Sequence, residues 1–431
     1  MTSGDDRYIL RAGRASDGLD LARLQASTQM QWITGGEPHE GIAAWVEGLF
    51  DGHPSVGPED FLVAEDVATG RPVGSLVDLR QTWTLGGVRF PVSQVELVAT
   101  EPEHRGNGLT GRMFAALHKR FAADGVAIQM IEGIPYFYRR LGYDYALAND
   151  GAAVVPAAAL PAGPAPLTVR PATVADADAL AGIDRALAGG DAFTCPRDAG
   201  VWRYEVAGRG ADDLCRRAVA VLVDGGEVRG YLVHTARLSS AGELTVLAAA
   251  CARPADWPAA ATAMYAYLAG VGRRHGTLTA VRPLLDPDHP LARFGPPGVP
   301  RRPRGWYVRT DDPAALLARL LPVLRARWHA ADLRWPGKDL VIDLYGPAVR
   351  LEFADGELAA VTTVRGTSDP SNDPATHATV PPGALLHLAL GHRTLPEILD
   401  AWPDCLVRDR VTERFLTAVF PRVPVRIWSR V

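Results

Sequence analysis

Two segments of the chain open alike, and this internal repeat limits the folds that the chain can adopt. Near the N-terminus, YILRA (8–12) is followed by Asp17 and then by leucines at helical spacing. From residue 167, LTVRPA (167–172) is followed by Asp176 and by apolar residues at the same spacing. Each segment predicts a short strand, an acidic helix cap and a helix. We therefore expect two copies of one α/β unit.

Two proline-rich stretches divide the chain further. VVPAAALPAGPAPL (154–167) lacks charge and predicts a semi-rigid linker. In FGPPGVPRRPRG (294–305) the prolines prevent any long regular element. A chain of 431 residues is expected to hold two or three domains. The predicted blocks are 1 to about 153, 168 to about 300, and about 306 to 431.

The first block follows an α/β pattern. Apolar runs bounded by turn residues predict strands, a four-residue repeat of Leu109, Met113, Leu117 and Phe121 predicts a helix, and GYDYAL is expected to close the sheet. The strands are expected at 61–67, 72–80, 92–100 and 127–133, the helix at 108–123 and a short helix at 136–141.

Composition excludes several classes of function. The net charge of −4 shows no basic excess for a nucleic-acid partner. No apolar run approaches the roughly 20 residues that span a membrane, and the N-terminus lacks the pattern of a signal peptide. The four cysteines are scattered, which argues against a zinc site or disulfides and favours a cytoplasmic protein. We expect no metal cofactor.

The segment RGNGLT (105–110) lies between the predicted strand at 92–100 and the predicted helix at 108–123. A helix start presents free N–H groups and a partial positive charge, and a glycine turn lets an anion approach the backbone. Arg105 adds a bidentate phosphate ligand. The segment therefore suits a pyrophosphate, although neither a P-loop nor a complete GxGxxG is present. A plain strand–turn–helix with an exposed arginine is the alternative.

The strand VELVATEP, the loop RGNGLT, the next helix and FYRRLGY together resemble the GNAT acyltransferase superfamily. The loop matches that family's Arg/Gln-x-x-Gly-x-Gly/Ala pattern, except that Thr110 replaces the last small residue. The resemblance implies acetyl-coenzyme A as co-substrate, with a pantetheine arm pairing near Val98 and Thr100. It implies a pyrophosphate held by Arg105, Gly106, Asn107, Gly108, Leu109 and Thr110.

Over the whole chain, the order of blocks looks like the Enhanced Intracellular Survival type of acetyltransferase. That type has two tandem GNAT folds with mixed sheets and a third α+β domain that resembles a sterol carrier protein. Block three agrees, with a strand and helix in WYVRTDDPAALLARLLP, successive strands in 340–364, helices in LLHLALGHRTLPEILDAW and the ending VPVRIWSRV. The resemblance also allows a homo-oligomer, hexameric or smaller.

Block two has lost the cofactor loop. No glycine lies between Gly242 and Gly270, and Pro254 and Pro258 stand where free amides are needed. We therefore expect one active site per chain, with the second sheet serving as scaffold and completing the acceptor cleft.

The resemblance assigns two catalytic roles. Tyr138, in FYRRLGY, falls at the family's general acid, and its ordinary pKa near 10 keeps it protonated at neutral pH. The chain-terminal carboxylate of Val431 falls at the family's base, although such a group is weakly basic unless it is desolvated. A packed core tyrosine and a tail without a role are the alternatives.

The predicted acceptor is an amine of a small molecule of the antibiotic or secondary-metabolite type. Aminoglycoside-modifying members hold acids where this chain has Arg304 and Arg430, and residues 27–36 carry no carboxylate. Arginine repels a polycation, so an amine with a carboxylate or phosphate, or a less charged metabolite, is favoured over an aminoglycoside. Both arginines could instead form salt bridges.

Two other functions stay open. One is a non-catalytic binding protein that carries an apolar ligand in its C-terminal domain, and the other is a GNAT enzyme with a non-acetyl donor. The intact RGNGLT and Tyr138 favour an N-acyltransferase over the binding protein.

Overall fold

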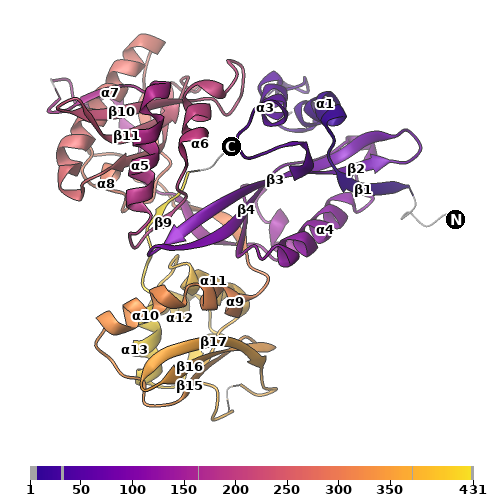
Figure 1. The fold of residues 1–431 in the computed structure, drawn as a ribbon, viewed down its shortest axis with the longest axis vertical. Coiled ribbons are helices and arrows are strands. Elements are labelled where there is room, and N and C mark those ends of the chain that lie inside the picture. Colours follow the sequence, from indigo (N-terminus) through magenta and orange to yellow (C-terminus); the bar gives the residue numbers. More distant parts are fainter. Residues whose placement is uncertain (1–6, 31–33, 164, 371, 429–431) are drawn as a thin grey trace.

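Three β-sheets with attached helices make up the molecule. The computed structural model describes residues 7–30, 34–163, 165–370 and 372–428. The first two sheets lie beside each other, and the third block lies below them in Figure 1. All three sheets mix parallel and antiparallel neighbours, which confirms the expected α/β class. Within the described ranges, no helix has the length and apolar character needed to cross a membrane.

The first sheet runs in the order β1-β2-β3-β4-β5-β14-β6, with β9 and β20 joined to it through β3. Only β4 with β5 and β9 with β20 are parallel. The strands that the apolar runs predicted in block one are confirmed. Their bounds are Tyr8–Ala12 for β1, Phe61–Asp66 for β2, Arg71–Leu85 for β3, Val88–Thr100 for β4, Ile128–Ile131 for β5, Arg304–Arg309 for β14, Asp144–Asp150 for β6, Phe193–Thr194 for β9 and Val425–Arg426 for β20.

Helices cover both faces of the first sheet. The predicted helix is α4 (Leu109–Ala123), whose four-residue repeat is buried against Leu76 and Val95. On the opposite face lie α1 (Gly18–Thr28) and α3 (Glu40–Phe50), packed against Leu79 and Leu97 (Figure 1). The core of this block is therefore two-layered, with β4 passing between the layers.

The second sheet repeats this plan in the order β7-β13-β12-β11-β10-β8. Part of the stretch expected to be a linker joins it, because Val155–Pro156 forms the edge strand β7. The other strands are Ala280–Pro283 (β13), Glu243–Cys251 (β12), Glu227–Thr235 (β11), Arg217–Asp224 (β10) and Thr168–Pro171 (β8). Its helices are Ala177–Leu187 (α5), Ala199–Arg203 (α6), Trp257–His275 (α7) and Pro290–Arg293 (α8).

One ion pair recurs at the start of both repeats. In block one, Arg11 of β1 contacts Asp17 at 2.6 Å, before α1. In block two, Arg170 of β8 contacts Asp176 at 2.8 Å, before α5. In both, the aspartate also accepts a backbone N–H three residues earlier. This shared strand–helix junction supports the predicted internal repeat.

Strand β14 corrects the expected place of one element. WYVRT was expected to open the third block, but β14 pairs antiparallel with β5 and β6 inside the first sheet. Without it, the four-residue β5 would leave an open edge, which is a liability for a buried strand. The chain thus returns to the first sheet after completing block two. Strand β9, within block two, and strand β20, near the end of the chain, also join that sheet.

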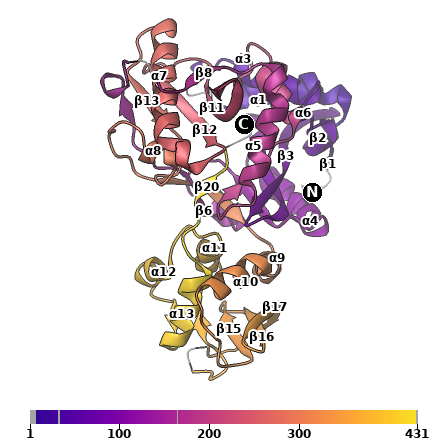
Figure 2. The same cartoon turned by 60° about the vertical axis from the view of Figure 1, so that its left-hand side comes forward.

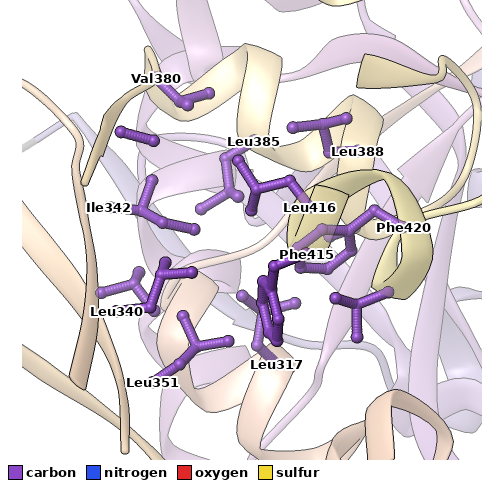
Figure 3. Packing of buried hydrophobic residues seen from close by; sticks show 14 of the residues in the cluster. Leu317, Leu340, Ile342, Leu351, Val380, Leu385, Leu388, Phe415, Leu416 and Phe420 are labelled. Atoms are coloured by element: carbon purple, nitrogen blue, oxygen red, sulfur yellow. The ribbon is translucent and has the colours of Figure 1, made fainter. Parts of the chain in front are cut away.

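The third block has a sheet in the order β17-β16-β15-β18-β19 and five helices in the described range. Figure 3 shows its interior filled by side chains from both layers, including Leu351, Leu385 and Phe415. The rings of Trp328 and Phe415 lie 4.9 Å apart. The elements are Glu357–Arg365 (β17), Pro347–Ala354 (β16), Asp339–Asp343 (β15), Ala378–Thr379 (β18), Leu406–Val407 (β19), Pro313–Arg319 (α9), Leu321–Ala330 (α10), Pro382–Ala389 (α11), Leu395–Ala401 (α12) and Arg410–Val419 (α13).

The third block docks on the first sheet through an apolar contact. Leu316, Leu386 and Val423 pack with Trp83 and Phe90 of the hairpin β3–β4. Figure 2 shows α9 and α11 beneath this sheet, with β20 rising beside β6. This packing fixes the hairpin end of β3 and β4, and the candidate site described below lies at the opposite end of β4.

Candidate active site

The site begins where two parallel strands separate. The ladder between β4 and β5 ends at Val95 and Ile131, so the rest of β4 has no strand partner on that side. A register shift opposite Leu76 marks a β-bulge, and Leu97 takes a φ of 51°. A leucine in the left-handed region costs about 1–3 kcal/mol, and such strain is concentrated at functional sites. The two strands therefore part beyond Val95 and Ile131, and Glu96 is the first residue of β4 past the parting point, which we call the cleft between β4 and β5.

The predicted pantetheine residues lie on the free arm of β4. The carbonyl of Val98 accepts a hydrogen bond from Gln29 Nε2 at 2.8 Å, and that of Thr100 accepts one from Arg105 Nε at 3.1 Å. A carbonyl oxygen has two lone pairs, so both groups can still accept from an extended amide chain. Gln25, buried in α1, fixes the bulge by donating to the Leu97 carbonyl at 2.5 Å.

The predicted pyrophosphate loop links this strand to α4. Gly106 and Gly108 adopt φ values of +81° and +70°, and at both positions an added Cβ would meet no atom within 4 Å. Gly108 is the N-cap of α4, and the first bond of the helix runs from Arg112 N–H to its carbonyl. The N–H groups of residues 109–111 thus have no helical acceptor. An exposed Arg105 completes a cradle that fits a phosphate anion.

Glu96 stands just past the parting point and was not among the site residues predicted from the sequence. Its side chain is 8 % exposed and accepts a hydrogen bond from Gln94 Nε2 at 2.8 Å. Burial raises its pKa to about 8, against the opposing effect of Gln94. A signal was available, because a lone carboxyl in the apolar run VELVA is rarely buried without a role.

Tyr138 lies in the short helix Phe137–Leu141 that the sequence predicted, close enough to Glu96 for that charge to act on its hydroxyl. The side chain is 4 % exposed, and its ring packs 5.7 Å from Phe114 and 5.9 Å from Tyr307. Burial, and then the charge of Glu96, raise the pKa of its hydroxyl well above 10. The tyrosine is therefore both a core residue and a neighbour of the cleft carboxyl, and it keeps its proton.

Glu132 follows β5 on the opposite wall of the cleft. Its side chain is exposed, yet the protein atoms around its carboxyl displace enough water to raise its pKa. The charge of Arg304 on β14 opposes this effect, so the predicted Arg304 lies near the cleft. The buried Trp306 indole N–H also approaches Glu132, but outside hydrogen-bond geometry. Among the described residues, no three His, Cys, Asp or Glu side chains are grouped so that they could hold a metal ion.

Block two supplies a cationic wall. Arg197 and Arg217 enclose the indole of Trp428, with guanidinium carbons 3.7 and 4.6 Å from the ring centroid. Arg217 is buried with Glu205 at 3.3 Å, and its neighbour Cys215 is close enough to Glu96 to feel that charge. Trp428 is 3 % exposed and packs in the core of block two, which therefore holds the end of the described chain. The predicted residues Arg430 and Val431 lie outside the described range.

The equivalent place in block two holds a pocket lined by Leu247, Leu284 and His289, but its chemistry differs from that of block one. There the parallel ladder ends at Val246 and Pro283, so Leu247 and Leu284 stand where block one has Glu96 and Glu132. The ring of His289 donates to the carbonyl of Ala249 at 3.2 Å and accepts from Leu291 N–H at 3.1 Å. Pro258 occupies the first turn of α7. This repeat therefore lacks both carboxyls. His289 occupies the strand carbonyl at Ala249, and Pro258 removes an amide from the start of the helix.

Comparison with known proteins gives one family match and several fold matches. Residues 37–146 match the family of the acetyltransferase (GNAT) domain. A GCN5-related N-acetyltransferase from Anabaena variabilis aligns with a TM-score of 0.67 at 14% identity, covering 98% of this chain and 99% of that one. A probable N-acyltransferase from Enterococcus faecalis gives 0.67 at 14%, covering 98% and 100%. Eis1 from Mycobacterium abscessus gives 0.59 at 17%, covering 96% and 98%.

No curated protein matches the sequence. At these identities the solved structures establish a shared fold over nearly the full length of the chain, and the family match falls on the strands, loop and helix that build the cleft. Residues 37–146 of the first block are therefore similar to the acetyltransferase (GNAT) domain, and the whole chain shares the fold of these solved structures.

Proposed function

We propose that the chain is an acetyl-coenzyme A-dependent N-acetyltransferase that acetylates an amine of a small molecule by direct attack on the thioester. The observation that carries the proposal is the parting of β4 and β5 at Val95 and Ile131, with the buried Glu96 just past it and Tyr138 within reach of its charge. Bound acetyl-coenzyme A supplies an activated acyl group. The amides after Gly108 and the side chain of Arg105 would hold its pyrophosphate, and the free arm of β4 its amide chain.

Glu96 is the proposed general base. An amine must lose a proton as it forms the new C–N bond, and a base works best when its pKa lies near the working pH. Burial holds the pKa of Glu96 at about 8, so the carboxyl accepts a proton far more readily than an exposed glutamate.

Tyr138 is the proposed donor at the departing sulfur. Its pKa lies well above 10, whereas that of a thiol is near 8.5. Complete proton transfer to the thiolate is therefore uphill, and the hydroxyl stabilises the developing negative charge by donating a hydrogen bond.

The terminal carboxylate of Val431 stays a second candidate for the base, on resemblance alone. The burial of Trp428 between Arg197 and Arg217 supports it, because the tail is anchored where block two faces Glu96. The two carboxylates are separable, since a C-terminal extension displaces one and substitution of Glu96 removes the other.

The proposed acceptor is an amine that carries little further positive charge, rather than a polycationic aminoglycoside. The charge of Arg304 acts on Glu132, and the charges of Glu96 and of Arg217 both reach Cys215, so cations lie near both carboxyls. Balanced charges give a polycation no net attraction at this site.

The proposal extends the family to the Enhanced Intracellular Survival type, with a sterol-carrier-like third domain. The fold shared with Eis1 from Mycobacterium abscessus over 96% of this chain supports it. The alternative role as a carrier of an apolar ligand finds little support, since side chains fill the third core. Trp335 and Phe353 stack there at 5.4 Å, and Figure 3 shows Leu385 and Phe415 in the same interior.

The test combines binding with product detection. Calorimetry with acetyl-coenzyme A and with longer acyl-coenzyme A thioesters measures which donor binds with the highest affinity. Mass spectrometry of a panel of amines incubated with that donor should then show a product heavier by one acyl group. We expect binding of acetyl-coenzyme A to the wild type and its loss in Arg105→Glu. A folded protein that binds no acyl-coenzyme A would contradict the proposal.

A further inference from the structure

A continuous line of hydrogen bonds runs along one face of the sheet, from Trp83 near the β3–β4 hairpin to Glu96. Trp83 Nε1 donates to Gln81 Oε1 at 2.9 Å, Gln81 Nε2 donates to Gln94 Oε1 at 2.7 Å, and Gln94 Nε2 donates to Glu96 Oε1 at 2.8 Å. Positions 81 and 83 share one face of β3, and 94 and 96 share the same face of β4. All four side chains are buried, with exposures from 0 to 8 %.

The first member fixes the direction of the line. An indole N–H can only donate, so it must meet the oxygen of the Gln81 amide. The Gln81 amino group then faces Gln94, which must present its own oxygen. The amino group of Gln94 is therefore left pointing at Glu96. Turning either amide over would bring two donors or two acceptors together in a buried place.

The line also begins at the contact between blocks. Cys195, which follows β9 of block two, donates its Sγ–H to the same Gln81 oxygen at 3.3 Å. A second donor on that oxygen supports the same orientation of the amide. The neighbouring pair Thr84 and Thr194, at 2.6 Å, ties β3 to β9 at this point.

We propose that Trp83, Gln81 and Gln94 are positioning residues that hold a permanent N–H donor on the Glu96 carboxyl and keep it directed into the cleft. The proposal deepens the proposed function and rests on it, because the donor matters only if Glu96 must be ionised during turnover. A donor to a carboxylate stabilises the ionised form, so the line keeps Glu96 available as a base at lower pH than burial alone would allow.

The experiment is an infrared titration of Glu96 in the full chain without ligand. The carboxyl band is identified by its absence in Glu96→Gln and is followed as pH rises, with a wild-type midpoint near pH 8. Gln94→Met, which keeps the volume but removes the donor, should raise the midpoint by about one pH unit. Gln81→Met should raise it less, because the Gln94 amide is then free to turn over, and Trp83→Phe least, because Cys195 still donates.

This rank order separates the proposal from general damage. Trp83 is among the largest fully buried side chains, so its substitution should lower the melting temperature most while moving the midpoint least. Gln129→Met is the matched control, since Gln129 is buried in β5 and bonds Asp311 and Tyr143 rather than the line. It should leave the midpoint unchanged.

Two results would overturn the inference: an unchanged midpoint in Gln94→Met, or an equal change in Gln129→Met. Failure of the proposed function shows itself in another measurement, namely wild-type turnover by Glu96→Gln. A lowered turnover in Glu96→Gln together with an unchanged midpoint in Gln94→Met would reject the positioning line alone.

Discussion

A single buried carboxyl carries most of the chemistry argued for this cleft. Glu96 lies between the apolar residues Val95 and Leu97 of β4, and its carboxyl is buried. Its ionised form is stabilised by the side chain of Gln94 and by the backbone N–H of Glu132. Such a group lowers stability when charged, and active sites are where proteins accept that cost. Tyr138 behaves differently, because its ring contributes to the core whether or not its hydroxyl acts.

Substitution of Glu96 by glutamine should separate function from stability. We expect kcat to fall by about 10²–10⁴-fold, since the base is lost. In the wild type the pKa rises from about 4.3 unfolded to about 8 folded, so stability from this group declines as pH rises between those values. Glutamine does not titrate, so the variant should be more stable than wild type by a few kcal/mol at about pH 9 and by little at about pH 5. Urea unfolding at both values measures this, and an equal difference at both would contradict the assigned pKa.

The wild-type enzyme should also show the titration of Glu96 in its rate. Because the ionised carboxylate accepts the proton, kcat/KM should rise with pH through about 8 and level off above it. A profile measured with any accepted amine whose own pKa is known checks this. A rate that is flat from about pH 6 to pH 9 would assign the base elsewhere.

Tyr138→Phe should lower kcat by about 10²-fold while leaving acetyl-coenzyme A affinity nearly unchanged, because only the O–H at the sulfur is lost. Tyr143→Phe is the control, since this buried tyrosine belongs to the same aromatic cluster but bonds His118 and Gln129. Rates and calorimetry on both variants decide the matter. An equal loss of kcat in both would make Tyr138 a structural residue.

At the scale of elements, local patterns predicted local structure. The strands β2, β3 and β4 and helix α4 follow from alternating or four-residue apolar spacing, and the open turn 105–110 follows from its glycines. The place of β14 between β5 and β6 could not be predicted in this way, because strand pairing over such a separation leaves no local pattern. The buried carboxyl in VELVA was a local signal for Glu96. Its role was missed because the residues that interact with it, Glu132 after β5 and Tyr138, are distant in sequence.

The loop before α4 gives a prediction at this scale. Arg105→Glu should weaken acetyl-coenzyme A binding by about 10²-fold, because a charge-assisted phosphate contact is worth about 1.5–3 kcal/mol and reversal adds repulsion. Arg89→Glu makes the same change of charge on an exposed residue at the other end of β4 and should have little effect. Calorimetry on the two folded variants compares them, and equal affinities would reject the loop as the phosphate site.

At the scale of the whole molecule, the cleft belongs to no single block. Strand β14 returns from block two to brace β5, β9 and β20 join the first sheet through β3, and Trp428 is enclosed by two arginines of block two. The third block packs on the hairpin of β3 and β4 through Leu316 and Leu386. The described end of the chain, at Trp428, thus depends on block two for its packing and on the first sheet for the pairing of β20, which makes the chain end a place to test how the blocks cooperate.

A C-terminal extension should show whether the tail carboxylate takes part in catalysis. If Val431 supplies a base, a short Gly-Ser extension moves the charge away and should lower kcat by about 10²-fold or more, with donor affinity unchanged because residues 105–110 lie on another element. An N-terminal extension of the same length is the control and should be silent. Combining the C-terminal extension with Glu96→Gln then separates two arrangements. If the two carboxylates serve one proton path, the kcat of the double variant should be no lower than that of the slower single variant. If their roles are independent, the two fold-losses in kcat should multiply. Full activity of the C-terminally extended protein would leave Glu96 as the base acting alone.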